Sequence, residues 1–121
     1  DLDKAIYYYE RANSLSPDDE NIKWLLKKVE RVKEVGKEAY EYFEEGRKLH
    51  LNADYANAAF YLEHAVGINP SYLEALVLLG KSYMRIGELK KAEDAFSKAK
   101  VIDPTNYELE LLLDEVKNKI K

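Results

Sequence analysis

Residues 76–104 read LVLLGKSYMRIGELKKAEDAFSKAKVIDP, and this stretch decides the fold. Its informative positions are small, large and apolar, or helix-stopping: Gly80, Ala92, Phe96, Ala99 and Pro104. Small residues let two helices approach closely, a large side chain fills the space between them, and proline ends a helix. The stretch therefore predicts two helices packed as a hairpin.

Matching residues occur 34 positions earlier in the chain. They are Gly46, Ala58, Leu62, Ala65 and Pro70. A fixed period of this size is typical of stacked helical hairpins, because each hairpin buries its apolar face against the next. We therefore expect two consecutive repeats, residues 39–72 and residues 73–106. The chain has only 3 Pro and 5 Gly among 121 residues, and so few turn-forming residues favour an all-α fold.

The two repeats resemble the tetratricopeptide repeat (TPR) family. The later repeat matches the family signature at Leu76, Leu79, Gly80, Tyr83, Ala92, Phe96, Ala99 and Pro104. The earlier repeat matches it at Tyr42, Gly46, Leu49, Ala58, Leu62, Ala65 and Pro70, and it has Glu45 where the family has Leu. The resemblance implies an α-solenoid of helical hairpins that acts as a non-enzymatic scaffold for protein–protein interaction.

The segments that flank these repeats follow the same pattern. Residues 1–17 are predicted to be the second helix of a truncated repeat, because small, large and Pro residues recur there at the spacings of Ala58, Leu62, Ala65 and Pro70. Residues 18–38 and residues 107–121 carry apolar residues at identical spacings after a proline. We expect both to be amphipathic capping helices, which cover the apolar face that a terminal repeat would otherwise expose to water.

The junction at Gly36 allows two interpretations. Apolar residues continue in helical phase through it, and no residue nearby caps a new helix, which favours one helix over residues 19–51. In the alternative, Gly36 adopts a left-handed conformation and ends the first helix. Two Ser/Thr-x-x-Glu capping boxes, which begin at Ser71 and Thr105, predict further helix starts.

The sequence contains no recognisable catalytic or metal-binding constellation. The chain has no Cys, and its two histidines, His50 and His64, fall on different predicted helices without the spacing of metal ligands. Glu44 and Glu45 are adjacent, so on a helix they would point about 100° apart. The five Gly are scattered singly, unlike those of a phosphate-binding loop. We therefore expect no enzyme activity, no metal and no cofactor.

The charge distribution indicates which partners suit the chain. The 23 acidic and 19 basic residues are interspersed and give a net charge of −4, which argues against nucleic acid as a partner. No apolar run reaches the roughly 18 to 20 residues that a membrane-spanning helix needs. We therefore expect a protein or peptide partner. Asp1 stands where an initiating Met would be, which suggests an internal or processed start and leaves the compartment open.

The TPR resemblance implies that the first helix of each repeat lines a concave, peptide-binding groove. The positions that would face this groove are Tyr40, Phe43, Arg47, His50, Lys81, Met84 and Arg85. Apolar residues flanked by cations suit an aromatic or aliphatic anchor beside a carboxylate. The family's chaperone-binding branch clamps a carboxylate with Lys and Asn, and the lack of Asn here disfavours that role. In the alternative, Phe43 only packs against its neighbours, and the chain is an architectural or self-associating segment.

The truncated repeat leads to an expectation about assembly. Its apolar stripe, formed by Ala5, Tyr9 and Ala12, lacks the first helix of its own repeat. A second copy of the chain can supply the missing surface, and twofold pairing is the commonest way to bury such a patch. We therefore expect this fragment to form a homodimer through residues 1–35.

Overall fold

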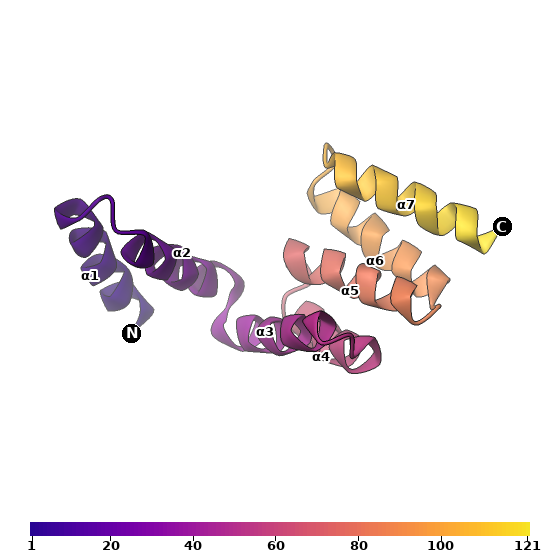
Figure 1. Ribbon diagram of the computed structural model, residues 1–121, viewed down its shortest axis with the longest axis horizontal. Coiled ribbons are helices and arrows are strands. Elements are labelled where there is room, and N and C mark those ends of the chain that lie inside the picture. Colours follow the sequence, from indigo (N-terminus) through magenta and orange to yellow (C-terminus); the bar gives the residue numbers. More distant parts are fainter. The chain divides into compact units, whose positions relative to one another are not determined.

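The computed structural model covers residues 1–121 and contains seven α-helices joined by short turns (Figure 1). The helices and the turns between them account for the whole chain, which confirms the all-α class. The chain divides into two compact units, residues 1–37 and residues 38–121. No helix combines the length and the apolar character needed to cross a membrane.

The first unit is a helical hairpin of α1 (Leu2–Leu15) and α2 (Glu20–Val35), which pack against each other. Asp1 and Asp19 cap the two helices, and each carboxylate accepts a hydrogen bond of 2.9 Å from the backbone N–H two residues further on. The stripe that we expected to lack a partner is half-buried within this unit: Ala5, Tyr9 and Ala12. The hairpin thus covers part of the surface for which a second copy had been invoked.

Gly36 separates α2 from the next helix. The helix α2 ends at Val35, and Gly36 adopts φ +96° and ψ +137° while its N–H still bonds the Val32 carbonyl at 2.9 Å. Glycine tolerates a positive φ because it has no Cβ, whereas a continuing helix requires a negative φ. The expectation of one helix over residues 19–51 is therefore wrong, and the alternative in which Gly36 ends the first helix is correct.

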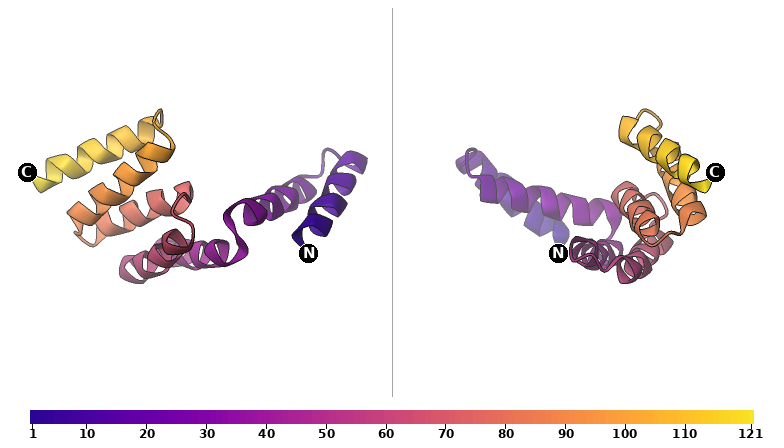
Figure 2. Two further views of the ribbon diagram at one scale, coloured as in Figure 1. Left: turned by 180° about the vertical axis from the view of Figure 1, so that it is seen from behind. Right: turned by 45° about the vertical axis from the view of Figure 1, so that its right-hand side comes forward.

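The second unit is built from the five remaining helices, shown from two more sides in Figure 2. They are α3 (Lys37–Leu51), α4 (Tyr55–Ile68), α5 (Leu73–Arg85), α6 (Leu89–Ile102) and α7 (Tyr107–Ile120). Helix α5 packs against α4 and α6, and α6 also packs against α7. Turn residues with positive φ, Ala53 at +62° and Gly87 at +83°, follow α3 and α5. A short turn thus joins the two helices of each repeat.

The repeat residues meet in the same way in both hairpins of this unit. A Cβ atom added to Gly46 would lie 2.6 Å from Leu62 Cγ, and one added to Gly80 would lie 2.4 Å from Phe96 Cε1. Leu62 and Phe96 are themselves fully buried. The small residues expected at the closest helix approach are also fully buried: Ala58, Ala65, Ala92 and Ala99. Each hairpin therefore closes by placing a large side chain directly over a glycine.

Both capping boxes expected at Ser71 and Thr105 are wrong. Helix α5 has Tyr72 at its N-cap position and no side-chain cap. Helix α7 is capped by Asn106, whose Oδ1 accepts the Leu109 N–H at 3.2 Å. In both cases the residue after the Ser or Thr occupies the N-cap position. The hydroxyl therefore stands one residue too early to bond the N–H groups of the first helical turn.

Candidate functional site

A cavity of about 390 Å³ opens in the second unit between α3, α5 and α7, with the start of α4 at its edge. We call it the α5–α7 pocket, and its lining residues are His50, Tyr55, Lys81, Met84, Arg85, Leu112, Glu115 and Lys119. Four of the seven predicted groove residues belong to it. They are His50, Lys81, Met84 and Arg85.

Arg85 is held in place by Tyr55, the first residue of α4. One guanidinium nitrogen, Nη2, donates to the Tyr55 hydroxyl at 2.9 Å, and the guanidinium carbon lies 4.9 Å from the centroid of the Tyr55 ring. The ring of His50 meets the same tyrosine edge-on, with 5.0 Å between ring centroids. Contacts of this kind limit the rotamers of a long cationic side chain. Arg85 is therefore pre-positioned at the edge of the pocket.

His50 joins α3 to α5 through a hydrogen bond. Its Nδ1 lies 3.0 Å from the hydroxyl oxygen of Ser82, which is completely buried. Burial lowers the pKa of His50, and the nearby charges of Lys81 and Arg85 lower it further. Because all three effects disfavour the charged imidazolium, the ring is neutral at pH 7. His50 therefore contributes a polar but uncharged surface to the pocket.

The remaining charges of the pocket are mostly positive. Lys81, Arg85 and Lys119 supply three cations, of which Lys81 lies 3.3 Å from the carboxylate of Glu108, and Glu115 supplies one carboxylate. Glu115 lies 3.6 Å from the Lys119 ammonium, and the lysine and the glutamate are each about half exposed. Exposed ion pairs of this kind contribute little free energy, so a competing charge can displace them. The pocket can therefore receive a carboxylate without a large rearrangement.

The other three predicted groove residues, Tyr40, Phe43 and Arg47, belong to α3 like His50 but do not line this pocket. The ring of Phe43 lies 5.1 Å from the ring of Tyr72, so Phe43 packs against the start of α5. Arg47 donates two hydrogen bonds to Glu44, at 3.2 Å and 3.0 Å. These bonds raise the pKa of Arg47, whereas burial, followed by the charge of Glu44, raises the pKa of Tyr40. The structure thus engages Phe43 and Arg47 with neighbours outside the pocket.

Sequence reasoning missed half of the pocket. The missed residues come from the first turn of α4 and from α7: Tyr55, Leu112, Glu115 and Lys119. We had interpreted residues 107–121 only as a capping helix. A sequence signal was present, since Leu112, Glu115 and Lys119 follow the helical i, i+3, i+7 spacing of one face.

The other polar groups that sequence analysis singled out do not form a second site. His64 Nδ1 lies 2.8 Å from the carbonyl oxygen of Phe60, one turn earlier in α4. No group of three or more His, Asp or Glu side chains is arranged to hold a metal ion. The α5–α7 pocket is therefore the place where predicted residues converge.

The chain is similar to proteins of known family. A tetratricopeptide repeat family profile matches residues 42–113, which is more than half of the chain. Among solved structures, the C-terminal TPR-containing domain of a Plasmodium falciparum protein described as FK506-binding is 22% identical, with a TM-score of 0.63. The alignment covers 98% of this chain and 77% of that one, and at this identity it shows a shared fold. No curated protein matches the chain.

Proposed function

Because this chain belongs to the tetratricopeptide repeat family, we propose that it is a non-enzymatic interaction module whose α5–α7 pocket binds a segment of a partner protein. Repeats of this family generally mediate protein–protein interaction and are typically scaffolds. The segment carries an apolar anchor residue beside a carboxylate. The single observation that carries this proposal is the convergence of three cations around half-buried apolar side chains in one cavity.

The chemistry of the pocket supports a ligand of this kind. Met84 and Leu112 are half-buried, so each leaves apolar surface that an anchor residue can cover. Arg85 is already oriented by Tyr55, which lowers the entropic cost of pairing it with a carboxylate. Guanidinium groups pair well with carboxylates because two parallel N–H donors match two oxygens. Tyr40, Phe43 and Arg47 belong to the same helix as His50 and extend the proposed surface along α3.

The test uses charge reversal in the pocket. The double variant Lys81→Glu with Arg85→Glu is compared with the wild type for binding to short synthetic peptides, in which Leu or Phe is flanked by Glu. Fluorescence anisotropy measures the affinity. Reversing two rim charges should weaken binding at least about tenfold, which corresponds to roughly 1.4 kcal/mol. The matched control is Lys4→Glu with Lys27→Glu, which reverses two exposed charges in the first unit.

Thermal melting of both double variants separates a binding effect from a folding effect. The proposal requires the pocket variant to lose affinity while its melting curve stays close to that of the control. An unchanged affinity of the pocket variant would reject the pocket as the binding site. Sedimentation of the unliganded chain tests the architectural or self-associating alternative, and it also tests the homodimer expected through residues 1–35. Exposed aromatic side chains of the first unit favour that homodimer: Tyr7, Tyr8 and Trp24.

A further inference from the structure

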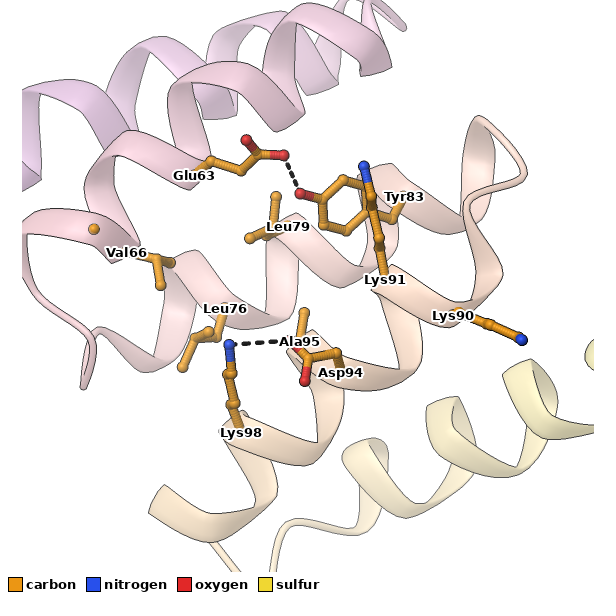
Figure 3. Close-up of a pocket in the computed structure, with 11 residues that line it drawn as sticks. Glu63, Val66, Leu76, Leu79, Tyr83, Lys90, Lys91, Asp94, Ala95 and Lys98 are labelled. Atoms are coloured by element: carbon orange, nitrogen blue, oxygen red, sulfur yellow. Dashed lines mark hydrogen bonds and ion pairs between the residues drawn. The ribbon is translucent and has the colours of Figure 1, made fainter.

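A second cavity, of about 610 Å³, lies between α4 and α6 with α5 beneath it (Figure 3). We call it the α4–α6 groove. It is lined by Glu63, Val66, Gly67, Leu76, Leu79, Tyr83, Lys90, Lys91, Asp94, Ala95 and Lys98. It shares no lining residue with the α5–α7 pocket. The groove is therefore a separate surface that the proposed function leaves unused.

The floor of the groove is apolar and rigid. Leu76, Leu79 and Ala95 are buried at 1%, 6% and 3% exposure, so they are held on all other sides by the core. Val66 is half-buried at the α4 side. Close-packed residues of this kind do not collapse into a neighbouring space. The floor is therefore a preformed apolar base with little area of its own, and the half-buried Val66 adds apolar surface for an inserted side chain.

Two polar pairs hold the walls of the groove, and Figure 3 shows both. The Tyr83 hydroxyl donates a hydrogen bond to Glu63 and so ties α5 to α4. Burial of the ring and its bond to Glu63 raise the pKa of the Tyr83 phenol, which therefore stays protonated and remains a donor. Lys98 pairs with Asp94 at 3.0 Å within α6. These four groups already have partners inside the chain.

Three charged groups of the lining form no ion pair: Glu63, whose partner is the neutral Tyr83 phenol, and two lysines at the start of α6. Lys90 and Lys91 are exposed and form no ion pair. The Lys91 ammonium lies 5.8 Å from the centroid of the Tyr83 ring, which directs it over the groove (Figure 3). Three lysines against two acidic residues, Glu63 and Asp94, give the lining a net charge of +1, and Lys91 is the cation held over the groove. Charge complementarity therefore favours an acidic occupant.

Gly67 leaves the α4 edge of the groove without a side chain. It is the next-to-last residue of α4, where glycine costs less than the roughly 1 kcal/mol relative to Ala of a helix interior. A Cβ atom at this position would meet nothing within 4 Å, in contrast to Gly46 and Gly80, which large side chains cover. Packing within the chain therefore does not require a glycine here. Its effect is to leave the α4 side of the cavity open.

We propose that the α4–α6 groove binds an acidic segment of a partner protein. One aliphatic or aromatic side chain of that segment enters over Leu76 and Leu79, and a neighbouring carboxylate pairs with Lys91. From Lys91 to Lys98 the groove follows seven residues of α6, or about 10 Å at the helical rise of 1.5 Å per residue. The occupant is therefore short, about two helical turns or a few extended residues. With the α5–α7 pocket, the module then has two separate contact surfaces.

The test is an NMR titration of the isotopically labelled full chain. The probes are short synthetic peptides in which Leu or Phe is flanked by Glu, and matched peptides in which the same residues are flanked by Lys. We expect Glu-flanked peptides to shift the amide resonances of Gly67, Leu79 and Ala95, and Lys-flanked peptides to leave them unchanged. Failure of every Glu-flanked peptide to shift these resonances, or equal binding of the Lys-flanked set, would overturn the proposal.

Two variants and two controls locate the site. Lys90→Glu with Lys91→Glu should weaken binding at least about tenfold, as expected for reversal of two steering charges. Gly67→Phe should block the groove and leave the melting temperature unchanged or higher. Two double variants serve as controls, and in both the peptide should still shift the Gly67 amide resonance. They are Lys4→Glu with Lys27→Glu, and Lys81→Glu with Arg85→Glu. Full retention of affinity by both groove variants would refute the proposal, as would loss of the Gly67 shift in the α5–α7 pocket variant. If the chain self-associates without peptide and Gly67→Phe abolishes this, the groove binds a second copy of the chain instead.

Discussion

Gly80 and Phe96 form the contact that closes the later repeat, so Gly80→Ala tests the packing directly. The added Cβ would lie 2.4 Å from Phe96 Cε1 and 2.7 Å from both Cδ1 and Cζ. Ordinary carbon–carbon contact lies near 3.5 Å, so the ring has to move by about 1 Å. Phe96 is fully buried, so its ring can move only by displacing its neighbours in the core. The substitution must therefore strain the helix–helix interface.

The expected change in the free energy of unfolding for Gly80→Ala is the sum of two opposing contributions. Overpacking a close-packed core costs about 1 to 3 kcal/mol, and a clash with three ring atoms belongs at the upper end. Replacing glycine by alanine inside a helix returns up to about 1 kcal/mol. We therefore expect Gly80→Ala to lower the free energy of unfolding by about 2 kcal/mol. For a unit of this size that corresponds to a melting temperature about 10 °C lower.

Gly67→Ala is the matched control, because it makes the same chemical change inside a helix without a contact. The added Cβ meets nothing within 4 Å, so only the gain in helix propensity remains, up to about 1 kcal/mol. Urea unfolding followed by far-UV circular dichroism measures both variants under the same conditions. The two should differ by about 2 to 3 kcal/mol, with Gly80→Ala less stable than the wild type and Gly67→Ala at least as stable. If Gly80→Ala is as stable as Gly67→Ala, the described packing of Phe96 on Gly80 is incorrect.

Two further predictions concern His50 and the start of α7. Burial, Lys81 and Arg85 lower the pKa of His50 in the folded chain, so the unfolded chain binds a proton first as the pH falls through the ordinary value of 6.5. The free energy of unfolding should therefore decrease as the pH falls below 6.5, until the pH passes the lowered pKa of His50 in the folded chain. The variant His50→Gln should show a smaller decrease. Urea unfolding above and below pH 6.5 measures both. Asn106→Ala removes the Oδ1 that caps α7 and should cost about 1 kcal/mol, whereas Thr105→Ala should be nearly neutral. The reverse order of these two costs in the same titrations would restore the Thr105 capping box.

The residues of the core were predictable because their pattern is periodic. Gly46 with Leu62 and Gly80 with Phe96 recur at the same interval, and each pair meets in the structure as expected. Local signals were less decisive. At Thr105 and Asn106, two adjacent residues can both cap a helix, and the start that α7 adopts selects one of them. Helix limits therefore depended on packing that the sequence pattern does not describe.

The α5–α7 pocket was only half predictable for a different reason. His50 and Arg85 stood out because they belong to the first helices of the two repeats, whereas Tyr55 belongs to a second helix and Lys119 to the helix predicted as a cap. Arg47 carries the same charge as Arg85 and also belongs to a first helix, yet it bonds Glu44. Helical spacing predicts which residues share a face but not which neighbour a flexible side chain selects.

By itself, the sequence determined the helical class, the repeat period and the pairing of glycines with large side chains. These features are short-range or periodic, so they follow from helical geometry and side-chain volume. Only the tertiary structure decided that α2 ends at Gly36 and that α7 contributes to the α5–α7 pocket. It also revealed the α4–α6 groove, because the lining residues of this cavity come from three helices that only the folded chain brings together.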